Sequence, residues 1–497
     1  MTPPPEPTPE TVAPGARVAG MMQRAMLWNL LNFAFSQGAG IVIFFMIAAQ
    51  VPPHIFGVIA LATLAADYVS LEGRNAAMDA ILQVGRYDEK SLSSAFTCFL
   101  VITLVIAGGL WLAAPGVGAA VAEPLVTDFM PLFGLMMLPV PWLSVMDAIM
   151  MRDLRYKEAT QRSIVGTLVG GAVGIGLAFS PWLLWALFGQ RLVSLIVVTA
   201  LEYKYTRWLP KLHFDRKSGF DFARRFFALW MISTLIQTIS RATLLAFGLR
   251  YDVVTVGLLR ATNRISEAVQ GPIISPLTNL WFPLMSKVKG DIAGERHVYN
   301  SIVRTATFVA LPTFAGLAIV ADDVVALLLP QQYAGVAPIL RATSITLLLI
   351  PVLWFNVVAL SAMGMNRMSL AYTAILVASS LSTLVAFHDV SPPAALLIMS
   401  VPCVIVGIAG NVILNRRLQQ TNLAHYGAMI PAVLATLAMS AATYALTAST
   451  SAWSVLPRLA LCVTAGGATY FGWLFAFHRI WLKDRILLLR GREPVPS

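Results

Sequence analysis

The chain has 497 residues, of which 58% are hydrophobic and 12% charged, and its formal net charge is +11. Such a composition leaves no room for a large soluble domain, and the absence of a P-loop, an HExxH motif and a nucleophile elbow argues against ATP-driven transport by this chain alone. The cysteines lie in apolar runs at unrelated spacings, so we predict neither a metal site nor a disulfide framework: Cys98, Cys403 and Cys462.

A Pro-rich polar stretch opens the chain, and one pattern then repeats along its length. Residues 1–20 lack the apolar core of a signal peptide, and we predict a disordered cytoplasmic tail there. About fourteen apolar stretches follow, each near the roughly 20 residues that cross a hydrocarbon layer as a helix. The sequence therefore predicts an all-α polytopic membrane protein with spans at roughly 26–49, 55–82, 91–113, 124–147, 163–180, 182–201, 226–249, 253–280, 302–322, 336–361, 368–387, 392–414, 426–447 and 454–477.

Basic residues lie mainly in alternate loops between these spans. Arg152, Arg155 and Lys157 share one loop, and the next loop on the same side carries a longer basic run within 203–225. Because cytoplasmic loops are enriched in Lys and Arg, we predict that both termini are cytoplasmic. The positive net charge then reflects topology and attraction to anionic lipid rather than nucleic-acid binding.

Segments of the chain recur after about 200 residues, which is the spacing of an internal duplication. Phe56-Gly57-Val58-Ile59 is echoed by Val256-Gly257-Leu258-Leu259, and Pro139-Val140-Pro141-Trp142 by Pro351-Val352-Leu353-Trp354. Six spans per repeat keep the orientation of the chain, so we expect parallel repeats with a central cavity between them. The alternative is a pseudosymmetric bundle without a cavity.

The duplication divides the chain into consecutive regions. We predict an N-lobe of six spans at 21–205 and a C-lobe of six spans at 206–418. Two further spans lie in 419–480, and a basic cytoplasmic tail occupies 481–497.

Several arginines fall inside the predicted spans. Each costs about 2.5–3.5 kcal/mol at the centre of a bilayer if it faces lipid, so these side chains must face the protein interior, a partner or water. Arg74 lies nearer the inner end of its span and Arg341 nearer the outer end. The full set is Arg74, Arg191, Arg241, Arg260, Arg264 and Arg341.

The span 253–280 carries a polar stripe. Arg260, Arg264 and Glu267 stand on one helical face, with Asn263 and Gln270 beside it. Glu267 is placed to neutralise Arg264, whereas no acid stands three or four residues from Arg260. We predict that this stripe lines a wet cavity and that Arg260 and Arg264 hold an anion. The alternative is that these residues hydrogen-bond neighbouring helices.

The span 55–82 is the repeat partner of that helix. Asp67 and Arg74 are seven residues apart, which puts them on one face of an α-helix. Asp67 either pairs with an arginine of the other lobe or carries a coupling proton or cation, and we expect Asp147 at the inner interface. Arg74 and Arg241 would support the anion site, and Asp67 and Glu267 would balance its charge. A guanidinium binds phosphate oxygens in a bidentate manner, so a phosphate-bearing substrate is expected.

Three short motifs resemble those of the Wzx-type polysaccharide flippases of the MOP exporter superfamily. Arg152-Asp153-Leu154-Arg155-Tyr156 is similar to the family's basic inner loop, and Trp185-Ala186-Leu187 with Gln190 to its sixth span. Phe282-Pro283-Leu284-Met285 with Asp291 is similar to the exit of its eighth span. The chain departs from the family at Leu71-Glu72-Gly73-Arg74, where Asp-Leu-Gly-Leu is frequent.

The resemblance implies a MATE-like fold of two six-helix lobes plus two helices. It implies translocation of undecaprenyl-pyrophosphate-linked oligosaccharide units to the periplasmic leaflet of the bacterial inner membrane, with the last two spans guiding the lipid tail. It implies no catalysis and no cofactor, with proton or sodium coupling left open, and polymerase or chain-length and export proteins as partners. The alternatives are a lipid II or multidrug exporter of the same superfamily and a membrane enzyme that acts on polysaccharides.

Overall fold

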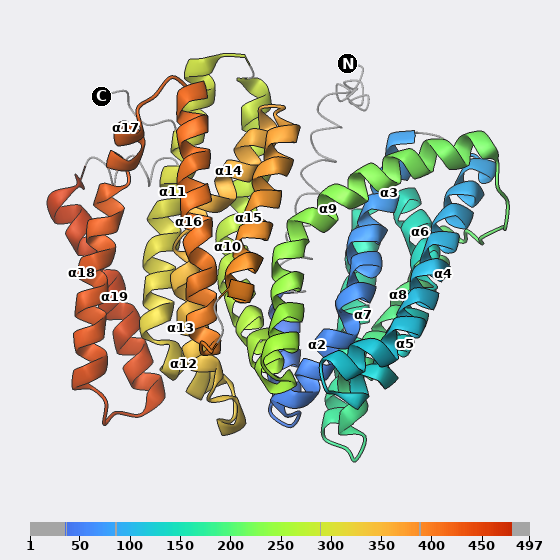
Figure 1. Ribbon diagram of the computed structural model, residues 1–497, viewed down its shortest axis with the longest axis horizontal. Helices are drawn as coiled ribbons and strands as arrows, with labels where there is room; N and C mark the ends of the chain where they lie inside the picture. Colours follow the sequence, from blue (N-terminus) through green and yellow to red (C-terminus); the bar gives the residue numbers. More distant parts are fainter. Residues whose placement is uncertain (1–34, 36, 85–86, 289, 387–388, 480–497) are drawn as a thin grey trace, which may run out of the picture. The chain divides into compact units, whose positions relative to one another are not determined.

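The computed structural model describes residues 35, 37–84, 87–288, 290–386 and 389–479. Over these residues the chain forms helices and no strands, as the sequence predicts (Figure 1). In this part of the chain eight helices are long and apolar enough to cross a membrane, and two shorter apolar helices accompany them at Gln37–Ala48 and Val336–Leu347. The polytopic membrane class is therefore confirmed, while the count of fourteen spans stays a prediction. Both predicted tails, residues 1–20 and 481–497, lie outside the described residues.

The helices follow one another with short connections. The first half of the chain contains α2 Pro53–Asp67, η1 Tyr68–Gly73, α3 Arg74–Val84, α4 Glu89–Ala120, α5 Pro124–Met136, α6 Val140–Arg152, α7 Tyr156–Ala178, η2 Leu183–Trp185, α8 Ala186–Thr206 and α9 Arg216–Arg250. The second half contains α10 Val253–Lys287, α11 Ile292–Ile319, α12 Ala321–Leu328, η3 Gln331–Tyr333, α13 Val336–Leu347, α14 Ile350–Ala362, α15 Asn366–Ala386, α16 Pro392–Arg417, α17 Asn422–Gly427, α18 Ile430–Ser449 and α19 Val455–Phe477.

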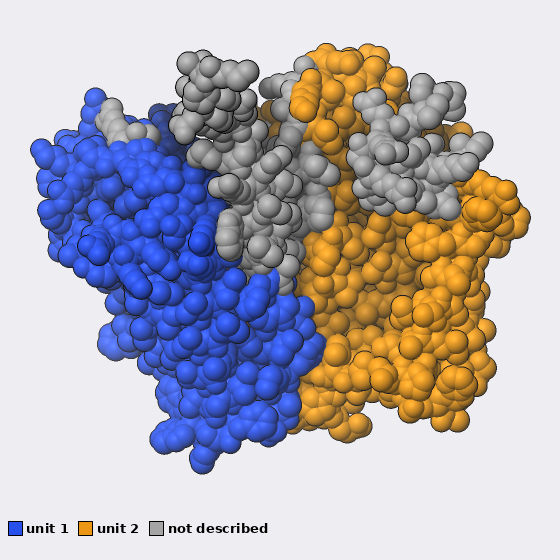
Figure 2. Space-filling model, turned by 180° about the vertical axis from the view of Figure 1, so that it is seen from behind, with its two compact units in different colours: residues 1–50, 65–113, 130–231 blue, residues 51–64, 114–129, 232–497 orange. Residues whose placement is uncertain are grey.

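These helices form two compact units, which are coloured separately in Figure 2. Unit 1 comprises residues 1–50, 65–113 and 130–231, and unit 2 comprises 51–64, 114–129 and 232–497. The division falls inside α9, beyond the predicted lobe boundary after residue 205. Unit 2 therefore contains two short segments of the predicted N-lobe together with residues 232–418 of the predicted C-lobe, whereas residues 206–231 belong to unit 1.

In unit 1, glycines allow α7 and α8 to approach closely. A β-carbon on Gly170 would lie 2.6 Å from the Gln190 carbonyl oxygen, and one on Gly166 would lie 2.5 Å from a methyl carbon of Val198. These separations are too short for real atoms, so only glycine fits. Residues four apart share a helix face, and small residues at that spacing let two backbones meet.

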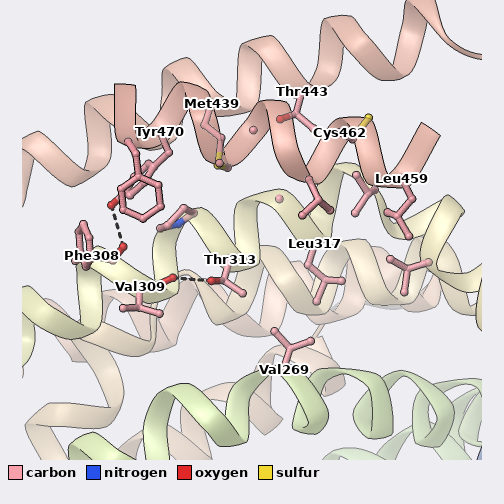
Figure 3. Close-up of a pocket in the computed structure, with 18 residues that line it drawn as sticks. Val269, Phe308, Val309, Thr313, Leu317, Met439, Thr443, Leu459, Cys462 and Tyr470 are labelled. Carbon is pink, nitrogen blue, oxygen red and sulfur yellow. Dashed lines mark hydrogen bonds between the residues drawn. The ribbon is translucent and has the colours of Figure 1, made fainter. Parts of the chain in front are cut away.

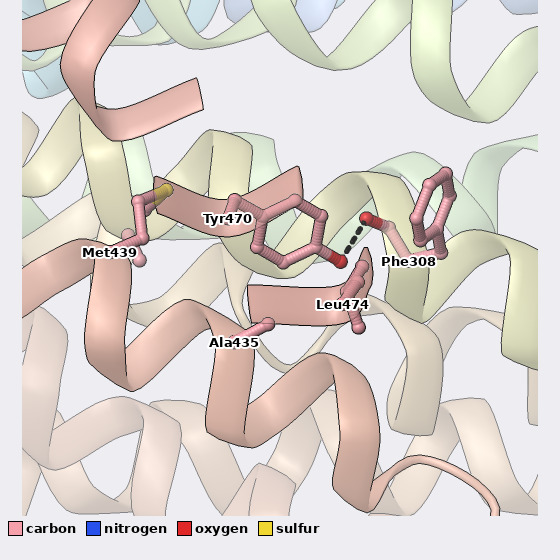
Figure 4. Packing of buried hydrophobic residues seen from close by; sticks show 6 residues of the cluster. Phe308, Ala435, Met439, Tyr470 and Leu474 are labelled. Carbon is pink, nitrogen blue, oxygen red and sulfur yellow. Dashed lines mark hydrogen bonds between the residues drawn. The ribbon is translucent and has the colours of Figure 1, made fainter. Parts of the chain in front are cut away.

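In unit 2, the last two membrane helices pack against α11. Phe308 of α11 and Met439 of α18 belong to one buried cluster with Tyr470 and Leu474 of α19 (Figure 4). The Tyr470 hydroxyl donates a 2.8 Å hydrogen bond to the Phe308 carbonyl oxygen. Satisfying that hydroxyl in an apolar cluster fixes α19 at one position along α11.

Two helices of unit 2 cross where both carry glycine. A β-carbon on Gly57 of α2 would overlap the carbonyl oxygen of Val253, and a β-carbon on Gly257 of α10 would overlap that of Pro53. The contact is reciprocal, since each overlapped carbonyl lies one helical turn before the other glycine. Gly57 and Gly257 occupy equivalent positions in the two sequence echoes, and the duplication itself stays a prediction.

Helix breaks recur at the second pair of echoes as well. The chain interrupts its α-helical hydrogen-bond pattern between α5 and α6, where Pro139 precedes α6 and Pro141 stands in its first turn. It does so again between α13 and α14, where Pro351 stands in the first turn of α14. Proline has no N–H to donate and crowds the preceding turn, so it is accommodated most easily at the start of a helix. Each of these predicted spans is therefore built from two shorter helices.

A buried polar network holds α17 against the start of α11. The ring of His425 stacks on Tyr299 with centroids 5.3 Å apart, and its Nδ1 lies 3.1 Å from Asn300 Oδ1. The Asn300 amide donates to Gln420 Oε1 at 2.7 Å, and the Gln420 amide donates to Asn415 Oδ1 at 2.7 Å. Burial, assisted by the nearby Arg304 guanidinium, lowers the pKa of His425 to about 4. His425 is therefore neutral at pH 7.

Replacing Gly57 with alanine should destabilise the protein, because the new methyl group overlaps a backbone oxygen that cannot rotate away. We expect a loss of about 3 kcal/mol or more, and a lower unfolding temperature in detergent than that of the wild type. Gly108→Ala is the matched control, since no atom lies within 4 Å of a β-carbon there. Equal unfolding temperatures for Gly57→Ala and Gly108→Ala would contradict the crossing.

Stability should fall between pH 6.5 and pH 4 in a manner that depends on His425. The unfolded chain binds a proton with the ordinary histidine pKa near 6.5, whereas the folded chain resists protonation down to about 4. The contribution is thus present above pH 6.5 and lost as pH falls through this window. Unfolding temperatures of wild type and His425→Gln across pH 4–8 measure it, and the variant should show a weaker acid dependence in that window. Parallel curves would contradict the assignment.

Candidate functional site

Four charged side chains form a buried cluster in unit 1. Arg74 of α3 donates through Nε to Asp147 Oδ2 at 2.6 Å and through Nη2 to Glu202 Oε1 at 2.8 Å. Arg162 of α7 lies against the same two acids, with Nη2 2.5 Å from Asp147 Oδ1 and Nη1 on Glu202 Oε1. The Glu202 side chain of α8 is fully buried and that of Asp147 is 6% exposed. The cluster is electrically neutral and joins α3, α6, α7 and α8.

This cluster changes the role expected for Arg74. Both ends of its guanidinium fork are occupied by carboxylates of its own unit, so we leave Arg74 out of the proposed anion site. Asp147 is buried within the cluster, with 6% of its side chain exposed. The attraction between the charges of a buried ion pair offsets the cost of their desolvation only when the geometry is good. Removing one partner is strongly unfavourable.

A π-helical turn separates Asp67 from Arg74. Asp67 ends α2, Arg74 begins α3, and the π-helix η1 occupies Tyr68–Gly73 between them. The wider π turn shifts the helical phase, so the two side chains do not share the face that seven-residue spacing predicts for an α-helix. Asp67 Oδ1 instead lies 3.0 Å from Arg191 Nη1 of α8. Asp67 thus pairs with an arginine of its own unit, which corrects the expectation of a partner from the other lobe.

The polar stripe of α10 faces away from the packed side of its unit. Thr262 and Ile265, on one side of the helix, are 0% and 4% exposed. Arg260 and Arg264 project from the opposite side and are partly accessible. Arg264 Nη1 lies 3.8 Å from Glu267 Oε2, with 27% and 50% of the two side chains exposed. A loose, hydrated pair of this kind is weak, so Arg264 keeps N–H donors for a further acceptor.

Asn263 and Gln270 stand beside this stripe on α10, and Arg241 belongs to α9. Asn263 lines a small cavity of about 180 Å³ in unit 2, together with Ser380 and Cys403. Gln270 and Arg241 are half-buried. The structure thus brings Arg260, Arg264 and Glu267 together and places Arg74 and Asp67 in ion pairs of unit 1.

Further ion pairs lie in unit 2 near the end of α11, whereas the His425 network lies near its start. Arg341 donates to Asp322 through Nη2 and to the Ala318 carbonyl oxygen through Nε, 3.3 Å away. Arg458 of α19 engages Asp323 through both Nη2 and Nε. Arg341 therefore contacts an acid near the start of the predicted span 336–361.

Sequence reasoning missed Arg162 and Glu202 as members of the cluster. Arg162 stands one residue before the predicted span 163–180, and the predicted span 182–201 ends one residue before Glu202. A lone carboxylate next to an apolar run was the available signal, because such a group is rarely buried without a partner. Its partners are distant in sequence, and only the fold brings them together.

An apolar pocket lies between α11 and α19 in unit 2. It has a volume of about 490 Å³, and Leu317 of α11, Leu459 and Val463 of α19 contribute to its wall. Val269, on the packed side of α10, closes one edge (Figure 3). The lining is almost entirely hydrocarbon, which suits an aliphatic chain and not a polar ligand.

Removing the charge of Glu202 should destabilise unit 1, because two buried guanidiniums lose a shared carboxylate. We expect Glu202→Gln to cost about 3–5 kcal/mol, measured as a fall in unfolding temperature in detergent. Asp153→Asn is the control, since Asp153 pairs with Arg152 at the surface and both side chains are 39% exposed. That change should cost about 1 kcal/mol or less. Equal losses for the two variants would contradict the role of the cluster.

Comparisons with known proteins show which proteins this chain resembles. A family model described as polysaccharide biosynthesis protein matches residues 47–338. The chain is 21% identical over 324 residues to the succinoglycan biosynthesis transport protein ExoT of Rhizobium meliloti (strain 1021), covering 65% of each chain. It is 20% identical over 331 residues to the lipopolysaccharide biosynthesis protein WzxC of Escherichia coli (strain K12), covering 63% of this chain and 64% of that protein. The matches thus span less than two thirds of these relatives.

Two solved structures share the fold. The lipid II flippase MurJ in an inward closed conformation aligns with a TM-score of 0.74 at 15% identity, covering 91% of this chain and 99% of that one. An inward-facing MATE family multidrug resistance transporter of the MOP superfamily aligns with a TM-score of 0.61 at 12% identity, covering 78% and 98%. The fold is that of these transporters. Because the family model matches more than half of its residues, the chain belongs to the polysaccharide biosynthesis protein family.

Proposed function

We propose that this protein is a flippase that carries undecaprenyl-pyrophosphate-linked oligosaccharide units from the cytoplasmic to the periplasmic leaflet by alternating access. The units would serve the synthesis of an exopolysaccharide, a capsule or an O-antigen. The protein would lie in a bacterial inner membrane with both termini in the cytoplasm, as the distribution of Lys and Arg favours. It would act as a transporter without a catalytic step.

The single observation that carries this proposal is the stripe of α10. Arg260 and Arg264 stand on the side of the helix opposite the buried Thr262 and Ile265, and both side chains are partly accessible. Two guanidinium groups that faced lipid would destabilise a membrane-spanning chain by several kcal/mol, and a bound anion would offset that cost. A pyrophosphate offers oxygens on two adjacent phosphorus atoms, which matches two arginine forks one helical turn apart.

The stripe also carries a way to release its ligand. Glu267 sits beside Arg264 and is half-exposed, so it competes with a bound phosphate for the same guanidinium. Transport requires binding that is specific and still reversible. An internal carboxylate of this kind balances the charge of the empty site and limits the affinity of the loaded one.

The apolar pocket between α11 and α19 supports the lipid part of the proposal. Its hydrocarbon lining would accept part of a polyprenyl chain, with Leu317 and Val463 among its contacts. It lies on the packed side of α10, whereas the arginines lie on the other side. Head group and tail would therefore occupy different faces of one helix.

The names of the relatives agree with this substrate class. ExoT is named as a transport protein of succinoglycan biosynthesis and WzxC as a lipopolysaccharide biosynthesis protein. Both products are assembled from sugar units. The partners of this chain would then be the lipid-linked oligosaccharide, membrane lipid, and the polymerase and chain-length or export proteins that use the translocated unit.

Replacing Arg260 and Arg264 together with alanine should abolish transport. Purified protein in liposomes that hold polyprenyl-pyrophosphate oligosaccharide in both leaflets should expose the inner pool to an added glycosidase, and the double variant should not. A loss of at least about 100-fold is expected from two charged hydrogen-bonding groups. Complementation of polymer export in a strain that lacks the gene provides a cellular readout.

Two further variants separate charge from geometry. Arg260→Lys with Arg264→Lys keeps the charge and removes the forks, and it should restore only part of the activity. Arg341→Ala removes an arginine of the same unit from the Asp322 pair and should leave transport near the wild-type rate. Full transport by the alanine double variant at normal folding would refute the site. Dye export in place of glycolipid transport would refute the proposed substrate.

A further inference from the structure

The first turns of α9 present three distinct faces, all within unit 1. One face is aromatic and buried: Phe226 is fully buried, stacks against Phe222 at 5.5 Å and contacts Trp230 at 5.3 Å. The Trp230 indole N–H donates a 3.0 Å hydrogen bond to the Tyr68 carbonyl oxygen. Residues four apart along a helix form one such row. These contacts fix the rotation of the helix about its own axis.

The start of the helix is fixed as well. The Asp215 backbone N–H donates to Ser94 Oγ of α4 at 2.8 Å, and the Asp215 side chain accepts from the Ser218 N–H at 2.8 Å. The bond from Ser218 holds the pKa of Asp215 below its usual range, so this cap stays ionised at neutral pH. The helix begins at a defined residue and in a defined direction.

A second face of the same turns is apolar and exposed. Phe220, Phe227 and Met231 are 64%, 45% and 70% exposed. They follow a basic connection between α8 and α9 that includes Arg207 and Lys211, and Lys204 lies in the last turn of α8. Exposed aromatic residues next to clustered basic residues are typical of a segment that lies in the head-group region of a membrane.

The third face forms a pocket with the end of α3. The cavity has a volume of about 450 Å³, and its polar lining consists of Gln83 of α3 with Asp221, Arg224 and Arg225 of α9. The two guanidiniums and the carboxylate leave one net positive charge. Ala228 and Leu229 form the rest of the lining, one turn further along the helix.

We propose that this pocket binds the phosphate of a lipid head group at the cytoplasmic surface, before substrate reaches α10. Arg224 and Arg225 donate to phosphate oxygens, the Gln83 amide adds a neutral donor, and Asp221 limits the affinity so that the phosphate can leave. The exposed Phe220, Phe227 and Met231 hold the pocket at head-group depth. The proposal rests on the proposed function for its orientation, and it adds a loading site that is separate from the stripe of α10.

Two lipids carry this chemistry: an anionic membrane lipid and the polyprenyl pyrophosphate of the substrate. Native mass spectrometry of the purified full chain distinguishes them, with phosphatidylglycerol and undecaprenyl pyrophosphate titrated in separate experiments. The test variant is Arg224→Gln with Arg225→Gln, which keeps side-chain polarity and removes two charges. The matched control is Arg216→Gln with Lys217→Gln, which removes the same charge from exposed residues of the same helix outside the pocket.

The pocket variant should lose lipid binding by about 10-fold or more, and the control by much less, because a hydrogen bond to a charged group contributes more than diffuse attraction. Weaker binding of undecaprenyl pyrophosphate alone assigns the pocket to the substrate. Weaker binding of both lipids assigns it to phosphate lipids in general. Equal losses for the pocket and control variants, or no loss, would overturn the proposal.

Transport separates the loading site from the proposed function. With the pocket variant, the substrate concentration that gives half the maximal rate should rise about 10-fold while the maximal rate stays near the wild-type value. Variants of Arg260 and Arg264 should instead lower the maximal rate of transport. A wild-type chain that binds phosphate lipid and flips no glycolipid would refute the function and leave the pocket standing. A pocket variant that loses the maximal rate with unchanged half-saturation would refute the loading role.

Discussion

The cost of holding a guanidinium among apolar helices governs where this protein places its polar groups. An arginine in such surroundings needs a carboxylate, another hydrogen-bond acceptor or water, and each choice leads to a different use. In unit 1, Arg74 and Arg162 are matched by Asp147 and Glu202. The resulting cluster is neutral and links several helix ends. It supplies cohesion to the unit and carries no excess charge with which to attract a ligand.

In unit 2 the same residue type is used differently. The α10 arginines are partly exposed on the side of the helix opposite Thr262 and Ile265, and the neighbouring carboxylate, Glu267, is loosely held. Glu202 has no exposed surface, and its ion pairs serve the structure of unit 1. Glu267 is half-exposed, and its ion pair can break and re-form more easily. The proposed anion site therefore draws its charge from α10 rather than from equivalent helices of both predicted repeats.

The sequence predicts features that depend on neighbours along the chain and misses those that depend on folding. The Arg264–Glu267 pair follows from three-residue spacing in a regular helix, and the glycine approach of α7 follows from four-residue spacing. The face shared by Asp67 and Arg74 was predicted wrongly, because a π turn that residue spacing does not reveal lies between them. Glu202 and Arg74 are 128 residues apart, so no local pattern indicates their contact. The anion site itself stays a prediction.

The glycine crossing of α2 and α10 has a mechanical consequence. Because main chain meets main chain there, no rotamer change loosens the contact and no side chain wedges it open. Sliding either helix along its axis would drive a β-carbon of an adjacent residue into a carbonyl oxygen. A change in the angle between the helices moves the atoms at the contact least. The crossing therefore acts as a pivot: when the angle between α2 and α10 changes, the point of contact moves least.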